Sequence, residues 1–182
     1  MSAGSGPDLL TLFQLFPPTA YLRDFDIVAA EHVPTPYHGL LVHEHHMTVT
    51  VESHHGSLVD VKVLEKKHEG NSYARKILLT LQSTGQVVMF GLVRIWLQYC
   101  SPEVRQEIVS QRTPIGRILI NHNVLRRIEP TDFFRLTPGP DMMRWFNLSQ
   151  PHPTYGRLAL IYCDGQPAVE LLEIVAPEEA SV

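Results

Sequence analysis

The amino-acid sequence predicts an α+β domain built around an antiparallel β-sheet. Runs of alternating or continuous apolar residues recur from residue 58 onward, as expected for strands. Two pairs of these runs are joined by short turn sequences, Ser-Thr-Gly at 83–85 and Asp-Gly at 164–165, which favour hairpins. Between the hairpins, two segments begin with Ser-Pro or Thr-Pro, a typical helix start. Hairpin-linked strands interrupted by helices are typical of the α+β class.

Each expected element has its own signal. The strand segments are apolar or β-branched runs bounded by turn residues: 58–66, 72–82, 86–98, 124–136, 155–163 and 166–176. The helical segments combine a capping residue or an early Pro with helical spacing of apolar residues: 8–16, 101–111 and 113–122. The Pro-containing segment 19–40 favours neither state. Most of the chain is thereby assigned before any function is considered.

Composition excludes several classes of protein. The chain has 182 residues, 44% of them apolar, and a net charge of −4, which fits one compact domain without a basic surface for nucleic acid. No signal peptide and no membrane-spanning run is evident. Cys100 and Cys163 lie far apart and are expected to be free thiols. We therefore expect a cytoplasmic protein, a monomer, with no nucleic-acid or membrane partner.

Two charged residues fall on apolar faces of their strands. Arg75 shares its side of the strand with Ile77, and Glu173 shares its side with Leu171 and Val175. A buried, unpaired charge is costly, so each residue needs a partner or a bound ligand. Either they pair with each other or with local groups, or they are the two ends of a closed pocket. Such a pocket would suit a small anion with a hydroxyl group opposite its acid group.

Two weaker features fit a ligand site. Gly91 interrupts an otherwise apolar strand, where a glycine often allows close approach of a backbone or ligand. The sequence Thr-Pro-Ile-Gly-Arg at 113–117 places free N–H groups at a helix start, where they can meet an oxyanion.

A Met-Thr segment that leads to Gly56 is followed by four motifs: "ARKILL", the "FG" of the next strand, "TPIGRIL" and "YGRLALIYCDGQPAVELLEIVAP". In this order, the motifs resemble those of the chorismate pyruvate-lyase family. The resemblance spans roughly residues 41–177. It implies an enzyme that eliminates pyruvate from chorismate to give 4-hydroxybenzoate for ubiquinone biosynthesis, a carbon–oxygen lyase without metal or cofactor. The implied fold is a sheet of about six strands with helical flaps over a buried ligand pocket.

The resemblance also implies a domain organisation and a set of site residues. Residues 1–40 become an N-terminal extension with a short helix, and 41–182 the chorismate lyase-like domain. Arg75 and Glu173 are implied as the catalytic pair, with Glu170 as the competing carboxylate. The implied substrate contacts are Met47, Gly91 and Ile115, and the second carboxylate of chorismate would need a further cation, for which the candidates are Arg94, Arg117 and Arg127.

The segment Leu41–Gly56 holds five of the ten histidines. His43, His45 and His46 are too close together to bind one ion from a helix, and His54 and His55 suit the C-terminal end of a helix. We interpret them first as histidines of a mobile flap, second as a ligand-facing residue, and least as a metal site.

Two alternatives to the lyase stay open. The same architecture occurs in effector-binding domains of transcription regulators, so the chain could be a non-catalytic domain that binds a small aromatic acid. The sequence shows no helix-turn-helix or basic face to support a regulator. The other alternative is an enzyme acting on a different chorismate-like acid. A purely structural protein is the least favoured alternative, because it would not explain why Arg75 and Glu173 place charges on apolar faces of their strands.

Overall fold

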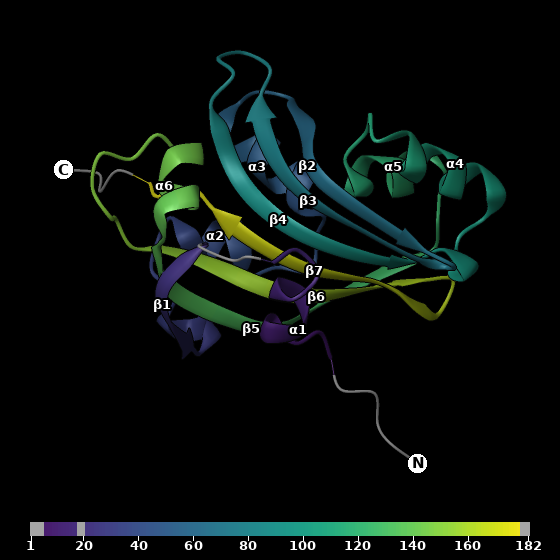
Figure 1. Ribbon diagram of the computed structural model, residues 1–182, viewed down its shortest axis with the longest axis horizontal. Helices are drawn as coiled ribbons and strands as arrows, with labels where there is room; N and C mark the ends of the chain where they lie inside the picture. The colour runs from purple at the N-terminus through teal and green to yellow at the C-terminus, as the bar shows by residue number, and fades with distance from the viewer. Residues whose placement is uncertain (1–5, 18–20, 179–182) are drawn as a thin grey trace.

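One antiparallel sheet of seven strands forms the centre of the molecule in the computed structural model, which describes residues 6–17 and 21–178 (Figure 1). The strands are β1 (Leu22–Val28), β2 (Val59–Glu69), β3 (Ser72–Leu81), β4 (Val87–Trp96), β5 (Arg126–Pro138), β6 (Thr154–Cys163) and β7 (Gln166–Val175). The α-helices are α1 (Leu9–Phe13), α2 (Tyr37–Leu41), α3 (Met47–His55), α4 (Pro102–Ser110), α5 (Ile115–Asn121) and α6 (Pro140–Trp145). No helix in this part of the chain is long and apolar enough to cross a bilayer. The predicted α+β class is confirmed.

The strand order is β1-β5-β6-β7-β4-β3-β2, and both predicted hairpins are present as β3–β4 and β6–β7. The two hairpins lie side by side because β4 pairs with β7. In this register Arg75 lies opposite Val93, and Gly91 lies opposite Glu173. Residues from distant parts of the sequence are thereby brought onto the same face of the sheet.

The strand β1 is the element that raises the sheet from the expected six strands to seven. It lies within residues 1–40 and pairs with β5, so this part of the expected extension belongs to the sheet. Its residues are mostly exposed, with Ile27 at 70% exposure and Phe25 at 39%. An edge strand that is solvated on both sides need not alternate apolar and polar residues. For this reason no strand pattern marks residues 22–28 in the sequence.

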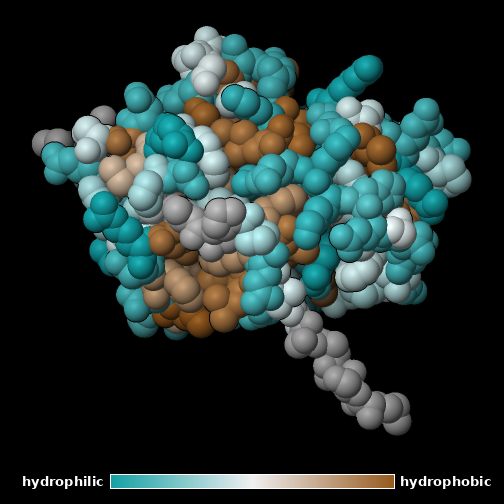
Figure 2. All heavy atoms as spheres, viewed as in Figure 1, coloured by the Kyte–Doolittle hydropathy of each residue, from teal (hydrophilic) through white to brown (hydrophobic). Residues whose placement is uncertain are grey.

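Helices cover both faces of the sheet, and each face has its own apolar cluster. On the face of Arg75, which we call the lid face, α2, α3, α4 and α5 pack against β3, β4, β6 and β7. On the opposite face, the back face, α1 and α6 pack over residues such as Phe90, Leu92 and Leu172. Figure 1 shows α1 and α6 in front of the strands, and α2 and α3 behind them. Figure 2 shows that apolar residues also reach the surface of the front side, in patches broken by polar groups.

The helix α3 is the flap that the resemblance implied. It ends at Gly56, whose φ of 61° lies in the left-handed region that glycine adopts without strain. Met47 and Val51 are buried against the sheet, and this burial offsets the low helix propensity of the β-branched residues in the segment. Glu52 forms an ion pair with Arg117 of α5 and also accepts a hydrogen bond from the backbone N–H of Val59. The flap is therefore held to α5 and to the start of β2.

Candidate functional site

The most completely bonded charge on the lid face is Arg157 of β6. Its side chain is fully buried, and its Nε donates to Glu173 at 2.7 Å. Its Nη1 donates to the carbonyl oxygens of Leu41 at 3.1 Å and His43 at 2.9 Å, and its Nη2 donates to that of His45 at 3.3 Å. One guanidinium thus neutralises Glu173 and fastens the segment before α3 to the sheet.

The second buried guanidinium, Arg75 of β3, has almost no partners. It too has no exposed surface, yet its one hydrogen bond within the described residues runs from Nη2 to the carbonyl oxygen of Thr113 at 3.3 Å. Its Nε and Nη1, which carry three N–H groups, have no acceptor. None of the ion pairs in the described part of the chain includes Arg75. Burial accordingly lowers the pKa of Arg75, because nothing nearby compensates its charge.

Besides Arg75, three buried polar groups in the described residues lack partners: the hydroxyls of Tyr73 and Thr131 and the Nε2 atom of His46. The hydroxyl of Tyr73, two residues before Arg75 on the same side of β3, has no hydrogen bond, and burial raises its pKa. The Nε2 atom of His46, at the start of α3, is also unbonded, and burial lowers the pKa of His46 to about 4. Buried polar groups are normally bonded, so each unbonded one requires an explanation.

A small cavity lies between the lid helices and the sheet. Its volume is about 20 Å³, enough for one water molecule but not for an aromatic acid. Its lining combines the start of α3, the start of α5 and the lid face of the sheet: His46, Met47, Thr48, Ile115, Gly116, Ile128, Arg157, Ile161, Leu171 and Glu173. The structure therefore represents a closed state of this site.

Two glycines contribute to this closure. A Cβ atom on Gly116 would lie 3.0 Å from Cβ of His46 and 3.1 Å from Oγ1 of Thr48, so glycine lets α5 pack tightly against the start of α3. A Cβ atom on Gly91 would lie 3.1 Å from Cγ1 of Ile77. The space beside Gly91 is therefore filled by the side chain of Ile77, which lies on the same face of the sheet.

An open groove of about 770 Å³ lies outside the cavity. It is lined by residues 44–46 and Val49, the end of α5 and the loop that follows, and the start of β5, including Arg126 and Arg127. His46 and Ile128 line both the groove and the cavity. These two residues form the wall between solvent and the buried site.

The structure gathers some of the residues expected for the site and separates others. Glu173, Met47 and Ile115 line the cavity, and Arg75 and Gly91 lie on the same sheet face. Arg94 lies on the back face, where it pairs with Glu170. The two remaining candidate cations lie toward solvent: Arg117 pairs with Glu52, and Arg127 pairs with Glu129 beside Tyr162.

The sequence analysis missed three residues that the structure places at or beside the site: Arg157, Tyr73 and His46. Arg157 shares its strand side with Ala159 and Ile161, the same signal that identified Arg75. Tyr73 could have been found by the same rule, since it lies two residues from Arg75. His46 gave no signal, because neither its burial nor its missing partner can be read from a cluster of histidines.

Comparison with known proteins places the fold. No protein-family model matches the sequence, and no curated protein matches it. Among solved structures, the chain is similar to PhnF from Mycobacterium smegmatis, with 10% identity and a TM-score of 0.55 over 74% of this chain and 64% of PhnF. It is also similar to the effector domain of PhnF, with 9% identity and a TM-score of 0.52 over 75% of this chain and 91% of that domain.

A third solved structure shares the same fold. This is the ligand-binding domain of a protein from Bordetella bronchiseptica that is assigned to the GntR-family transcriptional regulators, with 8% identity and a TM-score of 0.50. The match covers 68% of this chain and 92% of that domain. The chain thus spans 64% of the full PhnF chain but nearly all of two isolated ligand-binding or effector domains. The shared fold is that of an effector domain.

The expectation of a chorismate pyruvate-lyase is therefore wrong. Two of the solved structures that share the fold are an effector domain and the ligand-binding domain of a protein assigned to the transcriptional regulators. The local structure gives the physical reason for the error. The resemblance rests on residues that build the sheet and its lid, and one architecture can support several functions. The roles that the resemblance implies for Arg75 and Glu173 stay predictions; in the structure Glu173 is neutralised by Arg157 and not by Arg75.

Proposed function

We propose that this chain is a non-catalytic domain that binds a small anionic molecule between the lid helices and the sheet, with Arg75 as its anchor. The observation that carries the proposal is a fully buried guanidinium whose Nε and Nη1 lack acceptors. A carboxylate, phosphate or phosphonate group would supply the missing charge and up to three acceptor positions. In a site without water, such charge-assisted bonds are strong.

The hydroxyl of Tyr73 extends this recognition. It is buried on the same side of β3, two residues from Arg75, and has no hydrogen-bond partner. A ligand whose acidic group reaches Arg75 could therefore place a second polar atom against Tyr73. Most other buried side chains of the lid face are apolar, as is usual for pockets that hold small organic acids. The buried polar ones include Arg157, Glu173, His46 and Thr48.

Binding requires the lid to move, because the present cavity holds only about 20 Å³. Arg157 bonds the carbonyl groups of residues 41–45, so that segment stays fixed to the sheet. The start of α3 beyond it is free of such bonds and borders the open groove through His46. The ion pair between Glu52 and Arg117 holds α3 from outside, and a pair this exposed contributes about 1 kcal/mol or less. Opening of α3 toward the groove, which would also expose Met47 and Val51, is therefore the movement that we expect to admit a ligand.

The comparisons support ligand binding, because two of the solved structures with this fold are an effector domain and a ligand-binding domain. At 8–10% identity they carry the fold only, and the identity of the ligand has to come from the residues of this chain. The unpaired positive charge of Arg75 favours an acidic ligand and disfavours a cationic one.

The proposal is tested by thermal unfolding and calorimetry with sodium benzoate, sodium pentanoate and inorganic phosphate as probes. At least one probe should raise the melting temperature of the native protein and give measurable heat of binding. Arg75→Met should abolish both effects, whereas the control Arg144→Met, at an exposed ion pair on α6, should leave them unchanged. An Arg75→Met protein that binds the same probe with native affinity would overturn the proposal.

A further inference from the structure

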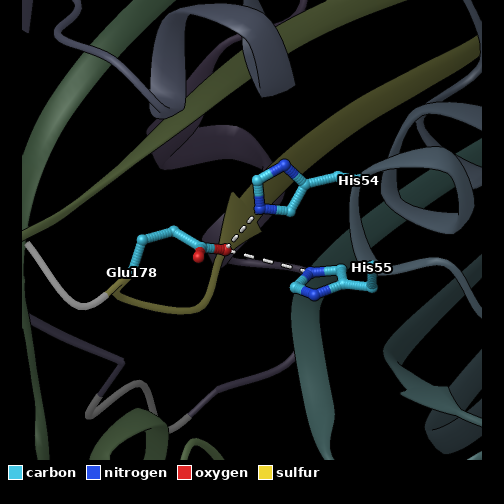
Figure 3. A group of neighbouring side chains, drawn as sticks. All are labelled: His54, His55 and Glu178. Atoms are coloured by element: carbon cyan, nitrogen blue, oxygen red, sulfur yellow. Dashed lines mark ion pairs between the residues drawn. The ribbon is translucent and has the colours of Figure 1, made fainter. Parts of the chain in front are cut away.

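Two histidines and one glutamate meet at the far end of α3, away from the cavity (Figure 3). His54 and His55 form the last turn of the helix, and Glu178 lies three residues beyond the end of β7. Oε1 of Glu178 lies 3.3 Å from Nε2 of His54 and 3.9 Å from Nε2 of His55. Figure 3 shows both imidazole rings turned toward the carboxylate from the same side of the helix end.

The surrounding structure holds the three side chains in this arrangement. Gly56 ends α3 immediately after His55, which fixes both histidines at the helix terminus. The backbone N–H of Glu178 donates to the hydroxyl of Tyr37 at 2.8 Å, and Tyr37 itself packs against Tyr155. Glu178 is thus placed by its main chain, so its carboxylate is not needed to anchor the segment.

The geometry fits a transition-metal ion. Two nitrogen or oxygen ligands held at 2.0–2.1 Å in a tetrahedral site lie about 3.3 Å apart. The separation of 3.3 Å between Glu178 and His54 equals this value, and that of 3.9 Å between Glu178 and His55 exceeds it. All three donor atoms lie within 4.8 Å of one another. The negative end of the α3 dipole adds a favourable potential for a cation. Within the described residues, this is the only group of three or more His, Cys, Asp or Glu side chains with such spacing.

We propose that His54, His55 and Glu178 form a binding site for a borderline divalent ion of the Zn²⁺, Co²⁺ or Ni²⁺ type. Two imidazoles and a carboxylate suit these ions, whereas Ca²⁺ and Mg²⁺ prefer oxygen ligands throughout. Three protein ligands leave a fourth position for water or another donor. This site was not predicted from the sequence, where Glu178 lies more than 120 residues from the histidines.

A bound ion would join the C-terminal end of α3 to the segment that follows β7. Because α3 also covers the cavity through His46, Met47 and Thr48, the ion would restrain the lid from its opposite end. This second part of the inference rests on the proposed function, while metal binding itself does not.

The binding test uses untagged protein stripped with a chelator and passed over a desalting column. Titration with CoCl₂ should give absorption bands between about 500 and 650 nm, typical of tetrahedral Co²⁺, that saturate at one ion per chain. Calorimetry with ZnCl₂ should give the same stoichiometry. His54→Ala and Glu178→Gln should each weaken Zn²⁺ binding at least tenfold, consistent with the loss of one of three ligands.

The matched control is His122→Ala. His122 and Glu107 form a comparable histidine–glutamate pair at 2.6 Å, but no second imidazole joins them. This variant should bind Zn²⁺ as the native protein does, and so should Arg75→Met, which separates the metal site from the anion site. Equal affinity of native and His54→Ala proteins, or no cobalt bands, would overturn the metal site and leave only an ion pair.

The effect on the lid is measured separately by hydrogen exchange. Addition of ZnCl₂ should slow exchange of the amides of α3 in the native protein and leave them unchanged in His54→Ala. Saturating Zn²⁺ with unchanged exchange in α3 would overturn the restraint on the lid.

Discussion

Two arginines lie fully buried on the same face of the same sheet, and they have opposite surroundings. Arg157 is bonded to Glu173 and to three main-chain carbonyl groups, so its charge and its donors are used. Arg75 has one hydrogen bond to Thr113 and two nitrogen atoms without a partner. Burial alone therefore does not distinguish a structural arginine from a ligand-binding one; the count of satisfied donors does.

The difference also distinguishes the segment before α3, which Arg157 holds to the sheet, from α3 itself, which we propose to move. Arg157 ties the chain just before α3 to the sheet, whereas nothing comparable ties Arg75 to α3. A protein that keeps a desolvated, unpaired cation sacrifices stability at that position, as binding sites often do. The following predictions test this contrast, in order of expected size.

Arg157→Met should lower the free energy of unfolding by about 3–5 kcal/mol, because Glu173 would remain buried without a partner. Urea unfolding followed by circular dichroism measures this. The double variant Arg157→Met with Glu173→Leu should recover a large part of the loss. A loss below about 1 kcal/mol in the single variant would remove the contrast between the two arginines.

Arg75→Met should have the opposite effect on stability: it should raise the free energy of unfolding by about 1–4 kcal/mol in the absence of ligand. The substitution removes a buried charge that lacks a counter-ion and replaces it with an apolar side chain of similar length. The same urea experiment applies, with Arg144→Met as the surface control. Destabilisation of a folded Arg75→Met protein would show that Arg75 is a structural residue like Arg157.

The pH dependence of the free energy of unfolding shows whether water reaches His46 beneath the lid. The pKa of His46 is lowered to about 4 in the folded protein and is near 6.5 when unfolded, so between these values the unfolded chain binds more protons. This stabilising contribution is complete above pH 6.5 and is lost as the pH falls toward 4. From pH 7 to 5 the loss from this residue is about 2 kcal/mol.

His46→Gln tests that assignment. Urea unfolding at pH 7 and pH 5 should show a smaller loss of stability in the variant than in the native protein. His43, whose pKa burial also lowers to about 4, should keep part of the dependence in both. An identical dependence in the two proteins would mean that His46 is hydrated, and that the lid does not seal the cavity.

The smallest effect is expected on the back face. Arg94 and Glu170 pair there, with 19% and 15% of their side chains exposed, so water still reaches both groups. Arg94→Met should lower the free energy of unfolding by about 1 kcal/mol or less and leave anion binding unchanged. A loss similar to that of Arg157→Met would show that strand pairing, not burial, sets the strength of these ion pairs.

Strands and hairpins could be predicted from the sequence because their signals are local. Alternation of apolar residues placed Arg75 and Glu173 on one face, and turn residues located both hairpins. The exposed edge strand β1 lacked such a pattern. The partner of Glu173 was missed because Arg157 becomes its neighbour only through the pairing of β6 with β7.

The site could be predicted only in part, for a related reason. Side-chain direction follows from local geometry, but the satisfaction of donors depends on main-chain carbonyl groups brought in by α3 and its approach segment. The activity predicted from the resemblance was wrong, whereas the fold class was right, because one architecture can support several functions.

The position of β7 has a consequence for how the chain folds. This strand follows all the others in the sequence, yet it lies in the middle of the sheet, between β6 and β4. Until β7 is available, the chain can form the meander β2–β3–β4 and the group β1–β5–β6, but each keeps unpaired the strand edge that β7 covers in the finished sheet. Such edges are templates for association between chains. Joining of the two halves must therefore wait until β7 emerges, and the interval before that is when this protein is most exposed to aggregation.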